Sequence, residues 1–143
     1  MWPVATYGCE SWTLRKAEEK KISAFENKCA RRILQIPWTA KMTNEAVWAK
    51  LGVKPELLNQ VKTRKLSYFG HVLRQEKASI EQTIMTGLTP GTRRRGRPAT
   101  AWIDNVTEWT QLKGSGLLST VRDRKSWRSL IHHCGQPSSM KKA

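Results

Sequence analysis

The sequence predicts an all-α fold, built as a small helical bundle joined through a basic hinge to a second short helical block. Apolar residues recur at helical spacing in several segments, and proline, glycine or threonine marks the ends of most of them. Only residues 4–7 have the composition of a strand, and no second strand is evident to pair with it. We therefore expect a brief edge strand within 1–12, a helical domain at 13–76, a basic linker at 77–98, a helical extension at 99–134 and a disordered tail at 135–143.

The first block, residues 13–76, is expected to hold three helices. Thr13 is the expected N-cap of the first helix, and Pro37 is expected to end it. Thr43 caps a short second helix that Gly52 closes, and Pro55 suits the first turn of the third. The apolar stripes are Ile22, Phe25, Cys29, Ile33 and Ile36 in the first helix, Ala46, Val47 and Leu51 in the second, and Leu58, Val61, Leu66, Phe69, Val72 and Leu73 in the third.

The C-terminal part is expected to add two clear helices. Residues 77–92 show only a weak helical pattern, which fades into a Thr-Pro-Gly-Thr loop. After the hinge, one helix ends near Gly114 and the last covers Asp123 to His133. Their apolar stripes, on which three tryptophans are expected to pack, are Trp102, Ile103, Val106, Trp109 and Leu112, then Trp127, Leu130 and Ile131.

The charge of the chain is strongly unbalanced. It has 26 lysines and arginines against 11 aspartates and glutamates, a formal net charge of +15. Residues 61–98 contribute most to this excess, with 9 basic and 2 acidic side chains. Such an imbalance favours polyanionic partners, with nucleic acid first and an anionic membrane surface second.

The most basic stretch is the hinge, in which four arginines fall within five residues around a glycine and before a proline. Arginine is always charged and matches phosphate oxygens with a planar fork, so the cluster is a candidate for phosphate contacts. The alternative is a solvated linker whose charge only keeps the chain soluble. The third helix is expected to present a basic outer side as well. The candidate nucleic-acid-binding residues are Lys62, Arg64, Lys65 and Arg74 on that helix and Arg93, Arg94, Arg95 and Arg97 in the hinge.

Several function classes find no support in the sequence. Aspartate occurs only at positions 104 and 123, whereas two-metal phosphoryl transfer needs clustered carboxylates. Asp104 lies at the start of a helix, where a carboxylate favours the helix dipole. His132, His133 and Cys134 lack a second ligand pair and make a poor zinc site. We therefore expect no catalytic residues, no metal, no cofactor, no small-molecule substrate and no membrane span.

The location of the protein is indicated only indirectly. Cys9, Cys29 and Cys134 are odd in number and far apart, which fits free thiols in a reducing compartment. The first residues lack the charged-then-apolar pattern of a secretory signal. A nuclear or cytoplasmic location is therefore expected.

A series of short sequence motifs occurs in order along residues 4–131. It comprises Tyr7-Gly8-Cys9-Glu10-Ser11-Trp12, Phe25-Glu26, Arg31-Arg32-Ile33-Leu34, Ile36, Trp38, Thr43-Asn44-Glu45, Val47, Arg64-Lys65-Leu66, Phe69-Gly70-His71-Val72-Leu73-Arg74, Gly96-Arg97-Pro98, Trp102-Ile103-Asp104, Asp123-Arg124 and Trp127-Arg128. In this order and with these gaps, the series resembles the C-terminal end of the reverse transcriptases (RNA-directed DNA polymerases) of LINE-type, non-LTR retrotransposons.

The resemblance implies a role that composition alone does not. In such proteins the Tyr-Gly-Cys-Glu segment leaves the polymerase palm and enters a helical thumb, which grips the template–product duplex by its backbone. Residues 1–12 would then be a remnant of the palm edge, residues 13–76 thumb-like, and the arginine hinge part of a basic extension. The fingers, the palm and the metal-binding aspartates would precede Met1. The resemblance thus implies a truncated fragment that binds RNA, DNA or hybrid without sequence preference and is not an enzyme by itself.

Two departures from the family pattern reduce the expected charge of the extension. Asn105 stands where the family often has a second aspartate, and Ala99, Thr100 and Ala101 stand where basic residues are usual. An alternative function is a non-catalytic helical interaction module. It would dock on a polymerase body, or self-associate, through residues 4–12.

Overall fold

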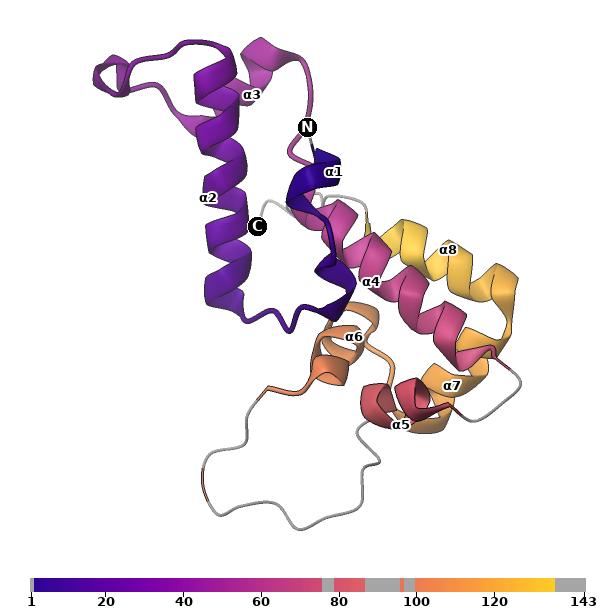
Figure 1. The fold of residues 1–143 in the computed structure, drawn as a ribbon. Helices are drawn as coiled ribbons and strands as arrows, with labels where there is room; N and C mark the ends of the chain where they lie inside the picture. The colour runs from indigo at the N-terminus through magenta and orange to yellow at the C-terminus, as the bar shows by residue number, and fades with distance from the viewer. Residues whose placement is uncertain (1, 76–78, 87–95, 97–99, 136–143) are drawn as a thin grey trace.

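The computed structural model describes residues 2–75, 79–86, 96 and 100–135, and these residues form helices connected by loops, with no strand among them (Figure 1). This confirms the predicted all-α class. The elements are α1 (Trp2–Ala5), the 3-10 helix η1 (Cys9–Ser11), α2 (Lys16–Ile33), the 3-10 helix η2 (Trp38–Ala40), α3 (Asn44–Leu51), α4 (Leu57–Leu73), α5 (Ile80–Thr86), α6 (Trp102–Thr110), α7 (Gly114–Arg122) and α8 (Arg124–Cys134).

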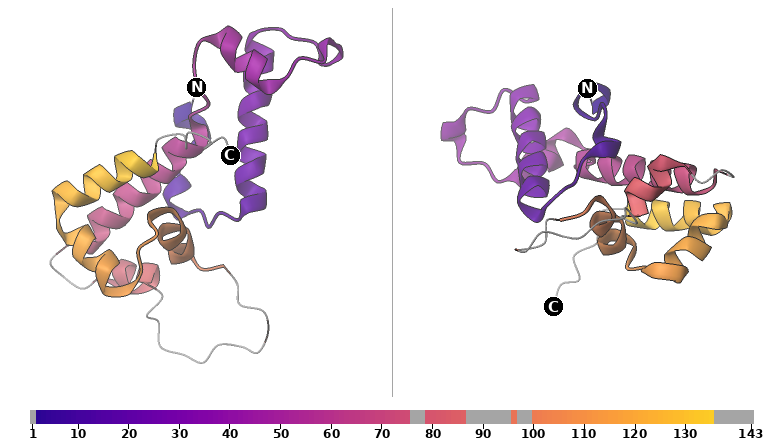
Figure 2. Two further views of the ribbon diagram at one scale, coloured as in Figure 1. Left: turned by 180° about the vertical axis from the view of Figure 1, so that it is seen from behind. Right: turned by 60° about the horizontal axis from the view of Figure 1, so that its bottom comes forward.

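Helix α4 is the central element of the fold. It lies beside α8 along most of its length, while α5 and α7 lie near its C-terminal end and α6 lies beside its middle, where Lys65 contacts Asn105 (Figures 1 and 2). Helices α2 and α3 form an arm at the other end, where α2 contacts the start of α4. Helix α4 therefore connects the arm to the rest of the molecule.

The main hydrophobic core lies between α4 and the C-terminal helices. Its buried members are Leu66 and Phe69 of α4, Val106 of α6, Leu117 and Val121 of α7, and Trp127 and Ile131 of α8. The tryptophans predicted to pack do so, because Trp127 is buried and Trp102 and Trp109 lie half-buried against this cluster. The domain boundaries at 13–76 and 99–134 stay a prediction, but helices from both ranges share this one core.

Helices α4 and α8 pack tightly at Gly70, which is buried. The indole of Trp127 covers this glycine and donates its Nε1–H to the carbonyl of Leu66 at 3.1 Å. A β-carbon at Gly70 would lie 2.6 Å from Cδ1 of Trp127, so a side chain does not fit there. The indole of Trp127 can therefore pack directly on the backbone of α4 because position 70 carries no side chain.

The N-terminal segment is helical, and the strand predicted at 4–7 is wrong. Trp2–Ala5 form α1, and Thr6 continues the turn by donating its hydroxyl to the Trp2 carbonyl at 2.9 Å. With no partner strand in the described residues, the backbone satisfies its hydrogen bonds locally. Cys9, Leu14 and Val61 then form a second buried cluster that fixes this segment to α4.

The predicted start and end of the first helix also need correction. Helix α2 begins after Arg15, whose backbone N–H donates to the carboxylate of Glu18 at 2.6 Å, so Thr13 is not its N-cap. The helix ends at Ile33, before Pro37, because Gln35 adopts a left-handed conformation with φ of 52°. In contrast, Thr43 caps α3 and Gly52 closes it with φ of 66°, as predicted.

The apolar stripe predicted for α2 is only partly buried. Phe25 and Ile33 remain 47% and 56% exposed, whereas Glu26 and Ala30 are buried. The Glu26 carboxylate accepts the backbone N–H groups of Glu56 and Leu57 at 2.7 and 2.9 Å and so caps the start of α4. Since this cap comes from another helix, it leaves no local signal in the sequence around α4.

Two further elements differ from prediction. Helix α7 is unexpected, because two glycines and two serines among its nine residues mask the i, i+4 pair of Leu117 and Val121. Helix α5 forms, but Ile80 and Ile84 face solvent.

Helix α8 begins after Asp123, close to the predicted start. The predicted linker and tail fall largely outside the described residues.

Candidate nucleic-acid interface

Lys65 does not lie on the outer side of α4, and its predicted placement is wrong. The side chain is 0% exposed. Its Nζ donates to the Trp12 carbonyl at 2.6 Å and to Oδ1 of Asn105 at 2.7 Å, and lies 4.4 Å from the ring centroid of Trp102. Burial lowers the pKa of Lys65 to about 8. A cation held by these groups links α4 to the N-terminal segment and α6, and is not available to a phosphate.

The sequence contained a signal for this burial. Lys65 follows Val61 by four residues and precedes Phe69 by four, so it lies within the apolar stripe of α4. Val61 and Phe69 are both buried. The charge of Lys65 led to its assignment to the solvent face, although its spacing indicated the core.

The three other predicted cations of α4 have different surroundings. Lys62 is half-buried, with Nζ 5.5 Å from the ring centroid of Trp109. Arg64 is exposed and donates to the Thr6 carbonyl at 3.3 Å. Arg74 is half-buried and donates to the Val121 carbonyl at 3.0 Å. Arg64 is therefore the most accessible of the cations predicted on this helix.

The arginines of the hinge lie outside the described residues. Arg93, Arg94, Arg95 and Arg97 are thus neither placed on a surface nor brought together with α4. Their assignment as phosphate contacts stays a prediction from the sequence.

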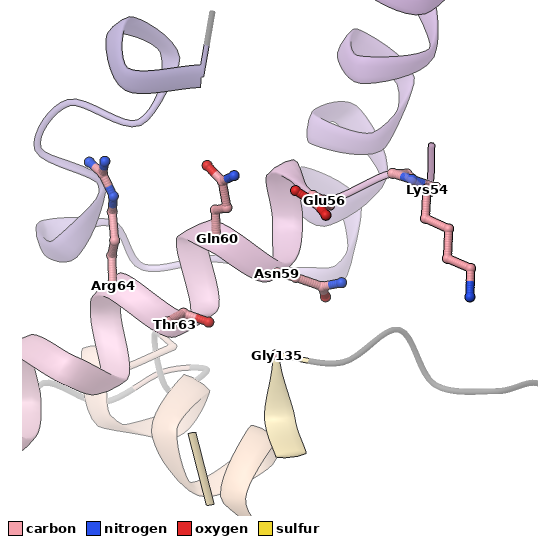
Figure 3. A pocket seen from close by; sticks show the side chains of 8 residues that line it. Lys54, Glu56, Asn59, Gln60, Thr63, Arg64 and Gly135 are labelled. Atoms are coloured by element: carbon pink, nitrogen blue, oxygen red, sulfur yellow. The ribbon is translucent and has the colours of Figure 1, made fainter. Parts of the chain in front are cut away.

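Arg64 borders a surface hollow of about 400 Å³ along the first half of α4 (Figure 3). Asn59 and Thr63 lie on the side of α4 that faces Gly135, at the end of α8, and Lys54 stands at the far end of the hollow (Figure 3). Two cations with amide and hydroxyl groups between them suit contacts with phosphate and sugar oxygens. The carboxylate of Glu56 also lines this hollow and reduces its positive charge.

A second hollow, of about 860 Å³, lies on α8 and was not predicted. Arg124, Lys125, Arg128, Ser129 and His132 line it, with no carboxylate among them. The sequence contained a signal, since Arg124 and Arg128 are four residues apart, but the segment has less net charge than the hinge. Trp127 and Ile131 of the same helix are buried in the core, whereas the residues that line this hollow are exposed.

Both aspartates of the chain serve as helix caps. Asp104 accepts the backbone N–H of Ala101 at 2.7 Å. Asp123 accepts those of Lys125 and Ser126 at 3.0 and 3.4 Å, and its pKa is lowered by these bonds and above all by the Ser126 hydroxyl. Asp104 thus has the structural role that the sequence indicated.

No group of three metal-ligating side chains occurs among the described residues, and none of their helices has the length and apolar character needed to cross a bilayer. Cys9, Cys29 and Cys134 are free, and burial raises the pKa of Cys9 and Cys134.

Comparisons with known proteins yield one informative relative. The chain is 31% identical over 140 residues to a Caenorhabditis elegans protein named as an uncharacterized transposon-derived protein. The match covers 90% of this chain, and the chain spans about half the length of that relative. No protein-family model and no solved structure match the chain. The similarity to a transposon-derived protein is consistent with a transposon origin.

Proposed function

We propose that this chain is a nucleic-acid-binding segment of a retrotransposon reverse transcriptase, which holds a template–product duplex by its phosphate backbone. The order of the short sequence motifs supports the assignment to a reverse transcriptase, and the similarity to a transposon-derived protein supports a transposon origin of the chain. Because phosphate contacts position a protein without reading bases, binding is expected to be independent of sequence. We further propose that the chain has no polymerase activity of its own; metal-dependent nucleotide incorporation by the purified chain would contradict this.

One observation carries the proposal, namely that the positive charge is not neutralised within the molecule. The chain has a net charge of +15. Among the described residues a single ion pair occurs, between Lys16 and Glu108 at 3.4 Å, and both side chains are largely exposed. Because no other ion pair occurs among the described residues, an external polyanion is the natural partner of their exposed cations.

We expect the hinge to contribute a large part of this binding. The parent chain and a variant with Arg93, Arg94, Arg95 and Arg97 changed to glutamine are titrated onto a 20-base-pair RNA–DNA hybrid at several salt concentrations. Each phosphate contact adds about 0.9 to the log–log salt slope, so the variant's slope should be shallower by roughly 3.6. Equal slopes would assign the hinge a passive role, and absent or salt-insensitive binding of the parent would contradict the proposed function.

A second candidate function is an interaction module, and one observation favours it. Val4 and Tyr7 are each 87% exposed, and Phe25 of α2 also faces solvent. Large apolar side chains left exposed are candidates for contacts with another protein. The partner would be a polymerase body or a second copy of the chain.

This second function predicts self-association of the isolated chain. We expect a concentration-dependent increase in mass during size-exclusion chromatography with light scattering, and a return to the monomer when Val4 and Tyr7 are changed to serine. A matched control changes Val53, which is exposed in the loop after α3, to serine and should leave the self-association unchanged. A monodisperse monomer of the parent chain at all concentrations would contradict self-association.

A further inference from the structure

The outer face of α8 concentrates positive charge more densely than the predicted residues of α4 do. Arg124, Lys125, Arg128 and His132 line the hollow described above, together with the hydroxyl of Ser129. All five side chains are exposed, and none forms an ion pair with any residue that the structure describes. The face therefore offers several donors and no internal acceptor for them.

A fourth cation, Arg74, reinforces this face from the C-terminal end of α4. Burial lowers the pKa of Arg74, and repulsion from the charges of Arg124 and Arg128 lowers it further. Arg74 is held in place by its hydrogen bond to the Val121 carbonyl. Crowded like charges raise the free energy of the isolated chain, and a bound anion relieves this repulsion.

The nearby carboxylate does not neutralise these cations. Asp123 is engaged with the first backbone N–H groups of α8 and with the hydroxyl of Ser126. The helix N-terminus is thus already capped by the protein itself. An anion on α8 would therefore be bound by the side chains along the helix and not by its end.

The length of this face suits a row of phosphates. Its hydrogen-bond donors run along α8 from Arg124 to His132. At about 1.5 Å per residue this stretch advances about 12 Å, the axial length of about three to four successive phosphates in one strand of a duplex. Burial of Trp127 and Ile131 against α4 fixes the direction of the face. A rigid, extended row of cations fits a phosphate backbone better than it fits one small anion.

We propose that the outer face of α8, formed by Arg124, Lys125, Arg128, Ser129 and His132 and extended by Arg74, is a binding surface for the phosphate backbone of a nucleic-acid duplex. The proposal rests on the proposed function and names the folded surface that performs it. Apart from Arg74, the residues of this surface are not among those that the sequence indicated.

The test compares two variants that lose the same charge at different places. One variant changes Arg124, Lys125 and Arg128 to glutamine. The control changes three exposed cations to glutamine, namely Arg15, which precedes α2, and Lys20 and Arg32 on α2. Each is titrated onto a fluorescent 20-base-pair RNA–DNA hybrid between 50 and 200 mM salt, after circular dichroism has shown equal helicity. The α8 variant should have a log–log slope shallower by about 2.7, so this salt increase weakens the parent about 40-fold more than the variant. The α2 variant should keep most of the parent's slope.

The outcomes separate this proposal from the proposed function. Salt-dependent binding that is unchanged in the α8 variant would overturn the α8 surface and leave the proposed function standing. Equal losses in the two variants would also overturn it, because total charge and not position would then decide affinity. No binding by the parent chain would overturn both.

Discussion

We expect the Gly70→Ala substitution to lower the free energy of unfolding by about 3 kcal/mol, because overpacking a tight core contact displaces its neighbours. The new methyl group would overlap the indole of Trp127 and lie 2.8 Å from a guanidinium nitrogen of Arg74. Trp127 is 2% exposed and cannot move aside without opening the core between α4 and α8. Urea unfolding followed by tryptophan fluorescence measures the change.

A second glycine provides a control of opposite sign. Gly116 lies in α7 with no atom near the position of an added β-carbon. Alanine there favours the helix by about 0.5–1 kcal/mol, so Gly116→Ala should stabilise the protein. If Gly70→Ala were neutral under the same conditions, the close packing of α8 on α4 would be incorrect.

The second large effect is a rise in stability with pH that originates from Lys65. Its pKa in the folded protein is about 8, below the ordinary value of 10.5. Between these values the unfolded chain binds more protons than the folded one, so the free energy of unfolding rises with pH across this interval. Below pH 8 both states are protonated, and the full cost of burying the charge is present. We expect an increase of about 2 kcal/mol from pH 7 to pH 10.

The Lys65→Met variant should lack this increase. Methionine has a similar length and no proton to lose, so its free energy of unfolding should not rise over the same range. Lys62→Met is the matched control, since Lys62 lies on the same helix but is only half-buried and should leave the increase intact. The thiols of Cys9, which is buried, and of Cys134, which is half-buried, have raised pKa values; they act in the opposite direction and are common to all three proteins. The same increase in Lys65→Met would place the titrating group elsewhere.

The pH dependence also bears on binding. A lysine held by Trp12, Asn105 and Trp102 contributes to the net charge of the sequence but not to the surface seen by a nucleic acid. The salt slope of the chain should therefore reflect exposed cations only. Charge counted from a sequence overstates the number of available phosphate contacts whenever a cation lies on an apolar stripe.

Much of the secondary structure followed from the sequence, because its causes are local. The hydroxyl of Thr43 reaches the N–H of Ala46 three residues away, and Gly52 tolerates the left-handed conformation that closes α3. Asp123 caps α8 in the same way. Interactions within one helical turn depend on neighbouring residues alone, so their pattern is visible in the chain.

The tertiary structure decided which of these faces are buried and which can bind. Lys65 reaches Asn105, forty residues away, and Glu26 caps a helix that begins thirty-one residues later. Trp127 lies over Gly70, and the same packing turns Arg124 and Arg128 outward. The sequence by itself determined the helical class and the excess of positive charge. Where that charge is accessible depends on contacts between distant segments, which periodicity within one helix does not specify.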